Sequence, residues 1–210
     1  MRLQCLVVAA LALPLAASLD AQSLGAHPAP RPAETHFMQG MIGHHAQAVT
    51  MTALVEERTR SRAIRLIAER IAVSQRDEIG LMQRWLRARG VEPIDPAHAE
   101  HHGGAQHVMP GMLTPAQLDT LAGARDAPFD RAFLRFMIQH HEGALVMVRE
   151  LFATPGAAQD PALNRFARDV SADQRAEIAR MRRELEVVAR ETTPHDTTPH
   201  DTPPRRPAFR

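Results

Sequence analysis

Apolar residues recur every three or four positions over long stretches of the chain, which is the spacing of a buried helix face. The first stretch runs from Thr35 to about Arg58, and the second from about Arg62 to Arg89. Gly90 stands where a helix commonly ends, and Pro93 follows shortly after. Because the break between the two stretches is so short, we expect them to form antiparallel neighbouring helices.

A second pair of helices is predicted over residues 128–153 and 161–190, and Asp160 can cap the later one. Between the two pairs, residues 90–127 are rich in proline and glycine and are predicted to be a linker. Within this linker, Thr114 followed by proline can cap one short helix.

The two predicted helix pairs are copies of one another. The phrase MIGHHAQAVTM begins at Met41, and MIQHHEGALVM begins at Met137, about 96 residues later. A second phrase, Gln-x-x-Glu-Ile-x-x-Met, begins at Gln75 and again at Gln174, about 99 residues later. Four amphipathic helices in two duplicated hairpins predict an all-α fold, a four-helix bundle built from two tandem α-hairpins.

Each of the two longer phrases places a stripe of sulfur and imidazole side chains on one helix face, because positions i, i+3, i+4, i+7 and i+10 lie together. The stripes are Met41, His44, His45, Ala48 and Met51 in the first copy, and Met137, His140, His141, Ala144 and Met147 in the second. Phe37, Val55, Phe133 and Leu151 flank them, so we expect the stripes to be buried. Thioethers favour Cu(I), and imidazole accepts Cu(I), Cu(II) and zinc, so a metal site is indicated, with copper as the first choice and zinc still open.

The partner helices add further candidates to this metal site. Met82 and Met181 each end a glutamine-led phrase and could contribute thioethers. Glu78 and Glu177 could orient an imidazole by accepting its hydrogen bond, could bind the metal directly, or could pair with arginines at the surface. Methionine at helical spacing is also ordinary core filler, and buried histidines can serve only as hydrogen-bonding core residues. Four histidines, duplicated together with methionines, favour the metal.

A separate histidine- and methionine-rich tract lies in the linker. It consists of His98, His101, His102, His107, Met109 and Met112. Tracts of this composition bind copper, nickel or zinc loosely, and a solvated loop is an equal alternative.

The start of the chain has the composition of a secretory signal. Arg2 precedes an apolar run over residues 3–17, and small residues near Ala21 suit a cleavage site. We therefore predict a signal peptide over 1–21, with an uncleaved N-terminal anchor as the competing interpretation. The only cysteine, Cys5, would be removed with the signal, which suits an oxidising compartment. We expect a periplasmic or secreted protein without a stable membrane span after signal cleavage.

The remaining chain divides by composition. We predict a flexible N-terminal segment, the bundle over 34–191 and a disordered tail rich in threonine, proline and histidine. The flexible segment is 22–33 and the tail is 192–210. The bundle consists of a first hairpin over 34–89, the linker over 90–127 and a second hairpin over 128–191. The formal net charge is +1, so electrostatics indicate neither a nucleic-acid partner nor an anionic membrane surface.

With these motifs in hand, the chain resembles the secreted bacterial proteins of domain-of-unknown-function family 305. The likeness rests on the two His-His phrases, the two glutamine-led phrases and the Gly-Met-Leu-Thr-Pro segment that starts at Gly111, and it covers roughly Glu34 to Glu191. The resemblance implies a ferritin-like four-helix bundle, and periplasmic copper binding and tolerance as in some members. It does not by itself imply an activity.

Three hypotheses follow from the sequence. The leading one is a copper-binding protein that sequesters or passes on the ion without chemical turnover, with the metal ion as its partner and any protein partner unknown. The second is a ferritin-like metal oxidase, which is disfavoured for iron because the chain has no Glu-x-x-His motif. The third is a metal-free helical scaffold or partner-binding bundle.

Overall fold

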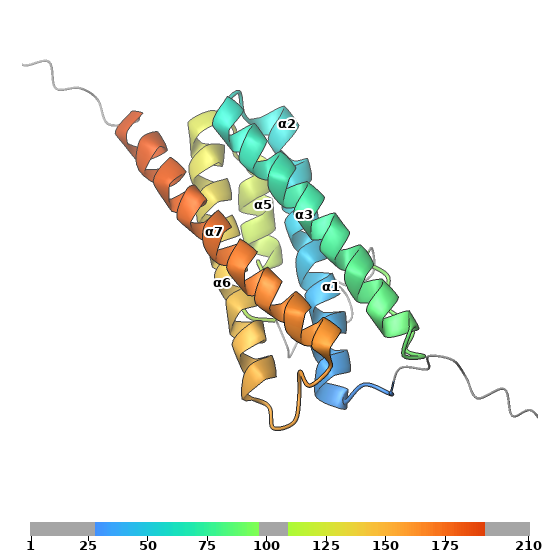
Figure 1. Cartoon of the computed structure of the whole chain (residues 1–210). Helices are drawn as coiled ribbons and strands as arrows, with labels where there is room; N and C mark the ends of the chain where they lie inside the picture. Colours follow the sequence, from blue (N-terminus) through green and yellow to red (C-terminus); the bar gives the residue numbers. More distant parts are fainter. Residues whose placement is uncertain (1–27, 97–108, 192–210) are drawn as a thin grey trace, which may run out of the picture.

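Four long helices account for most of residues 28–96 and 109–191, the part of the chain that this computed structural model describes (Figure 1). They are α1 (Pro32–Ala53), α3 (Arg62–Arg87), α6 (Asp126–Ala153) and α7 (Pro161–Glu191), with the short helices α2 (Val55–Arg58) and α5 (Pro115–Gly123) between them. The described residues contain no strand. The all-α prediction is therefore confirmed.

Helix ends follow the sequence signals. The Thr114 side chain accepts a hydrogen bond from the Gln117 backbone N–H at the start of α5. Asp160 accepts one from the Leu163 N–H, at 2.8 Å, at the start of α7. Gly90, just past the end of α3, has a φ of +71°, a conformation that glycine adopts without strain.

One predicted helix is interrupted. We expected a continuous helix to about Arg58, but α1 ends at Ala53 and Leu54 forms a turn before the four residues of α2. Just before this turn, the Thr52 hydroxyl donates a hydrogen bond of 2.8 Å to the Val49 carbonyl. Such side-chain bonds compete with the helix ladder and bend helices.

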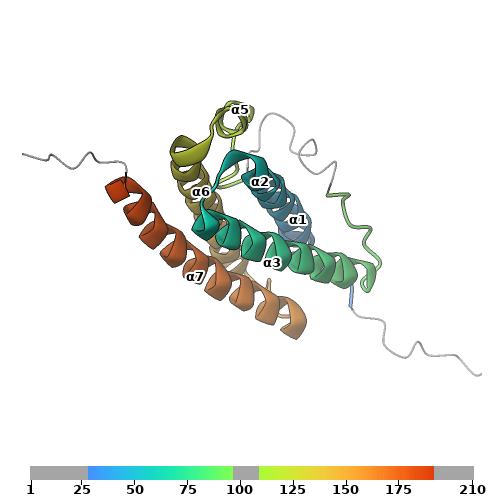
Figure 2. The same cartoon turned by 90° about the horizontal axis from the view of Figure 1, so that it is seen from above.

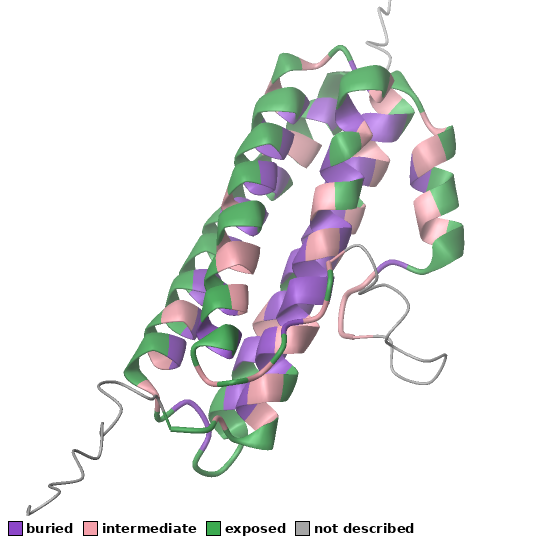
Figure 3. Ribbon diagram, turned by 90° about the vertical axis from the view of Figure 1, so that its right-hand side faces the viewer, coloured by how far each residue is buried: buried purple, intermediate pink, exposed green. Residues whose placement is uncertain are grey.

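The two hairpins pack with their first helices against each other. α1 packs along α3, α6 packs along α7, and α1 contacts α6. The colours of Figure 1 show that α1 and α6 run in opposite directions, and Figure 2 shows α3 beside α7. Figure 3 shows buried residues along the inward faces of the helices and exposed ones outside. This arrangement brings the two His-His phrases to the middle of the bundle.

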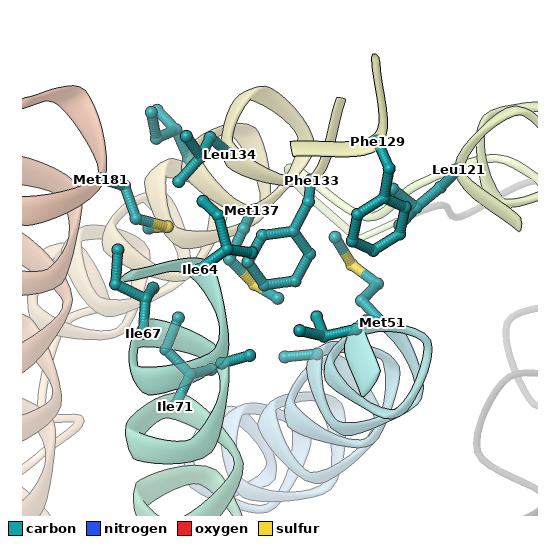
Figure 4. Packing of buried hydrophobic residues seen from close by; sticks show 14 of the residues in the cluster. Met51, Ile64, Ile67, Ile71, Leu121, Phe129, Phe133, Leu134, Met137 and Met181 are labelled. Atoms are coloured by element: carbon teal, nitrogen blue, oxygen red, sulfur yellow. The ribbon is translucent and has the colours of Figure 1, made fainter. Parts of the chain in front are cut away.

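Two clusters of apolar side chains fill the bundle on either side of the histidines. The Phe133 cluster (Figure 4) includes Met51, Ile64, Ile71, Phe129, Phe133, Met137 and Met181. The Trp85 cluster includes Phe37, Met38, Met41, Met82, Trp85, Met147 and Leu163. Residues 44 and 45 fall between the α1 members of the two clusters, and residues 140 and 141 fall between the α6 members.

Several predictions concern residues outside the described ranges. The signal peptide 1–21, the linker histidines from His98 to His107 and the tail 192–210 all lie there. Within the described residues, no helix combines the length and apolarity that a membrane span needs.

Candidate metal centre

The centre of the bundle holds a pair of histidine rings in contact. His44 of α1 and His140 of α6 have ring centroids 3.8 Å apart, with the ring planes inclined by 39°. Each residue is only 1% exposed. The two His-His phrases therefore meet, because their helices are antiparallel and cross at this position.

The second histidine of each phrase faces its own hairpin partner. His45 Nε2 lies 2.5 Å from Glu78 Oε2 of α3, and His141 Nε2 lies 2.7 Å from Glu177 Oε2 of α7. The sequence left three roles open for these glutamates: orienting an imidazole, binding the metal directly, or pairing with surface arginines. The structure shows the hydrogen bond to imidazole in both copies of the repeat. A carboxylate in this position fixes the orientation of the ring.

Each of the four histidines keeps one ring nitrogen without a hydrogen-bond partner among the described residues. His44 Nε2 lies 3.0 Å from the Pro110 carbonyl oxygen and must donate to it, and His140 bonds to the backbone of His44. The unpartnered atoms are His44 Nδ1, His45 Nδ1, His140 Nε2 and His141 Nδ1. In a neutral ring whose other nitrogen donates, such an atom carries a lone pair. Four buried lone pairs without a donor are uncommon in a protein core.

The central pair is held in the neutral form. Burial lowers the pKa of His44 from 6.5 to about 3, helped by the nearby His45, while the bond to Pro110 opposes the shift. Burial also lowers the pKa of His140 well below 6.5, with His44 as the next cause. Neutral imidazole is the form that binds metals.

All six candidate methionines on the long helices are buried, but they divide between the two clusters. Met41, Met82 and Met147 lie in the Trp85 cluster, and Met51, Met137 and Met181 lie in the Phe133 cluster. Because α1 and α6 are antiparallel, Met41 at the start of the first stripe lies in the same cluster as Met147 at the end of the second, and Met51 lies in the same cluster as Met137. The histidines are therefore flanked by one methionine group on each side.

A segment that sequence reasoning did not assign to the site covers the central pair. Residues 109–114 lie against α1 and α6, and Pro110 supplies the carbonyl that His44 contacts. Gln47 forms two hydrogen bonds with the Leu113 backbone, of 3.1 and 2.7 Å. On α6, a Cβ added to Gly143 would lie 1.9 Å from the Pro110 oxygen, so only glycine permits this approach. The sequence does contain a signal for this segment. Gln47 in the first copy of the repeat corresponds to Gly143 in the second, and both of these unlike residues contact the segment.

The imidazoles and carboxylates do not by themselves complete a site. Within the described residues, no group of three or more His, Cys, Asp or Glu side chains is placed to hold an ion. Metal binding here therefore needs thioether ligands, a rotation of the touching rings of His44 and His140, or both.

Solvent reaches the glutamates through two grooves between α3 and α7. Glu78 lines one groove of about 600 Å³, Glu177 lines a second of about 560 Å³, and Asp173 lines both. Burial raises the pKa of Asp173, and the neighbouring carboxylates of Glu78 and Glu177 raise it further. The two grooves carry both signs of charge, because Arg84 and Arg165 line the first and Arg70 lines the second.

Comparison with known proteins identifies relatives of the same fold. The family model for a domain of unknown function, DUF305, matches residues 34–185. A DUF305 fragment from Deinococcus radiodurans is 34% identical, covering 76% of this chain and 99% of that one, with a TM-score of 0.63. A DUF305 protein from Streptomyces coelicolor, described as secreted, is 28% identical over 75% of this chain and 94% of its own, with a TM-score of 0.64.

A further solved relative carries metal. The Cu(II)-bound form of CopM is 26% identical, covering 73% of this chain and 96% of CopM, with a TM-score of 0.60. CopM has also been solved with Cu(I) and with silver. Among curated proteins, the mimivirus protein L153, from Acanthamoeba polyphaga mimivirus, is 34% identical over 59 residues; the match spans 39% of that protein and 28% of this chain.

Proposed function

The chain belongs to the DUF305 family, and on that premise we propose that it is an exported copper-binding protein. It sequesters the ion or passes it on, and catalyses no reaction. Export rests on the leader-like start of the sequence and on the related Streptomyces protein described as secreted. Copper rests on the donor types and on the copper-bound CopM structures.

The observation that carries the proposal is the set of four buried ring nitrogens that have no hydrogen-bond partner within residues 28–96 and 109–191. Two belong to the touching rings of His44 and His140, and two belong to His45 and His141, whose opposite nitrogens contact carboxylates. A core built only for packing gains nothing from four buried lone pairs, whereas a metal site requires them.

The roles of the side chains follow from their contacts. The imidazoles of His44, His45, His140 and His141 offer nitrogen, and Glu78 and Glu177 orient the outer two rings. The flanking thioethers are those of Met41, Met82 and Met147 on one side and Met51, Met137 and Met181 on the other. Sulfur and nitrogen together suit copper in either oxidation state.

The test is the thermal stability of the tag-free mature protein with Cu(I), Cu(II), Zn(II) and Fe(II). A ligand that binds only the native state raises the melting temperature, so copper is expected to give the largest rise. In the double variant His44→Gln/His140→Gln the rise should vanish. The control is His36→Gln, which changes an exposed histidine on the same helix as His44. An equal copper effect in the double variant would contradict the proposal.

A metal-free scaffold is the competing function, and one observation favours it. The rings of His44 and His140 already contact each other, and no three nitrogen or oxygen donors converge among the described residues. A scaffold would show no rise in melting temperature with any of the four metals.

A further inference from the structure

Exposed apolar side chains form a row on the outer face of α3. Among the described residues, five large apolar side chains are exposed, and three of them lie on this one helix. Leu66 is 53% exposed, Val73 is 54% exposed and Leu81 is 48% exposed. Their spacing of seven and eight residues places them on one side of the helix. Single exposed apolar residues are normal, whereas a row of them along one helix indicates a surface that another molecule covers.

The row borders both grooves between α3 and α7. Leu66 and Val73 line the groove that contains Glu177. Leu81 lines the groove that contains Glu78. A molecule that covers the row therefore also covers the side of each groove that α3 forms.

Two opposite charges stand within the row. Arg70 lies between the first two apolar residues, and Asp77 lies between the last two. Both side chains are exposed, and neither forms a hydrogen bond or an ion pair with another described residue. Arg70 affects Asp173 of α7 through its charge alone, which opposes the rise of the Asp173 pKa. Both charges are thus available to a partner molecule.

The row is complementary to itself when two copies of α3 pack antiparallel. With a two-fold axis beside Val73, Leu66 lies opposite Leu81 of the second copy. Arg70 then lies opposite Asp77 of the second copy, because the two residues are equally far from the axis. The symmetry repeats each contact and gives two apolar pairs and two ion pairs.

The charges favour a second copy over a partner of another kind. A partner segment of one charge sign would attract either Arg70 or Asp77 and repel the other, whereas a second copy satisfies both. No like charges face each other in the antiparallel pair. Glu69 lies at the level of Glu78 of the second copy, but Glu78 points into the bundle, where it bonds to His45.

We propose that a second copy of this chain covers the row, forming a two-fold symmetric dimer in which the α3 helices pack antiparallel. The dimer needs no metal, so it goes beyond the copper-binding function and is tested independently of it. An interface limited to one helix pair is at the small end of the roughly 1,200–2,000 Å² that stable complexes bury, and the dimer therefore dissociates on dilution.

Cysteine cross-linking tests the register, because the mature chain without residues 1–21 contains no cysteine of its own. Under mild oxidation in metal-free buffer, Val73→Cys should form a disulfide-linked dimer. Leu66→Cys alone and Leu81→Cys alone should not, because identical residues at that distance from the axis lie about 22 Å apart. A mixture of these two variants should cross-link. The control for random collision is Val187→Cys, at an exposed residue of α7.

Charge reversal tests the ion pairs, with the dissociation constant measured by analytical ultracentrifugation. Arg70→Asp and Asp77→Arg should each weaken the dimer about tenfold, because symmetry turns both ion pairs into repulsive pairs. The double variant Arg70→Asp/Asp77→Arg exchanges the two charges and should restore the wild-type affinity. Arg76→Asp, which reverses an exposed arginine outside the row, should leave the affinity unchanged.

Three results would overturn the dimer. The first is a wild-type chain that sediments as a monomer at every concentration, and the second is cross-linking of Leu66→Cys alone as strong as that of the mixture. The third is a monomer in which the Val73→Cys thiol reacts faster once residues 192–210 are removed. That result would assign the row to the C-terminal end of the same chain.

Discussion

Replacing Gly143 by alanine should lift the 109–114 segment from the bundle. The added Cβ would lie 1.9 Å from the Pro110 oxygen, 2.4 Å from its carbonyl carbon and 2.6 Å from the Gly111 Cα. All three atoms belong to backbone, which cannot rotate away as a flexible side chain would. The segment must therefore move as a unit, and the contact between Pro110 and His44 goes with it.

The size of the effect follows from the contacts at risk. Overpacking of this kind costs about 1–3 kcal/mol. Displacing the segment also removes the Pro110 bond to His44 and the 3.3 Å bond from Gln139 to the Gly111 carbonyl, each worth about 1 kcal/mol. Alanine offsets up to about 1 kcal/mol through its higher helix propensity. The net loss should be about 3 kcal/mol, or roughly 10 °C in melting temperature for a domain of this size.

The assay is thermal unfolding of Gly143→Ala beside a control, Gly123→Ala. An added Cβ at Gly123, in α5, meets nothing within 4 Å, so the control should lose no stability. ¹⁵N NMR of the His44 ring supplies a second measurement, because the Nε2 environment should change only in Gly143→Ala. If both variants melt at the wild-type temperature, the close approach of Pro110 to α6 is wrong.

Three further predictions concern the carboxylates and the central histidine. Glu78→Gln and Glu177→Gln should each weaken copper binding by roughly 10- to 100-fold in a competition titration, because they remove the charge that orients a ring, and unchanged affinity would exclude that role. The unfolded chain protonates His44 near pH 6.5 but the folded one only near pH 3, so stability falls as the pH drops between these values. The free energy of unfolding should fall by about 2 kcal/mol between pH 7 and pH 5, which a urea titration would show as a lower midpoint. A higher midpoint at pH 5 would contradict the burial of His44 in its neutral form. Asp160→Ala should lower the free energy of unfolding by about 2 kcal/mol and change the fluorescence emission of Trp85, because Asp160 accepts a hydrogen bond of 3.1 Å from the indole N–H and caps α7. An unaltered emission spectrum and melting temperature would refute both contacts.

The helices and their buried faces could be predicted because both depend on local periodicity. The stripe through Met41, His44 and His45 has the spacing of a helix face, and its burial follows from apolar flanks such as Phe37. The structure confirms this, with all four of these residues buried. The hairpins could be predicted because the break before Arg62 is too short for any other connection.

The division of the methionines between the two clusters could not be predicted from either stripe alone, because it depends on the relative direction of α1 and α6. Met41 lies with Met147 only because α1 and α6 are antiparallel. The sequence repeat alone is silent on how its two copies face each other. The approach of Pro110 to His44 is likewise a contact over 66 positions in sequence, set by docking and not by spacing.

Breaks in the repeat were the overlooked signal. Where two copies of a phrase differ, their surroundings differ, and here the pairs Gln47/Gly143 and Gly40/Phe136 mark where the 109–114 segment and Met109 lie. These differences between the two copies indicate the side of the histidine pair that residues 109–114 cover. The choice of ring nitrogen in each histidine depends on hydrogen-bond partners and needs the structure.

The most direct test of the copper centre is an anomalous difference map from crystals of the copper-loaded protein, recorded at the copper absorption edge. The proposal predicts a peak between α1 and α6, bonded to at least one of the unpartnered ring nitrogens of His44 and His140. A peak confined to the protein surface, with these two rings still in contact, would contradict it.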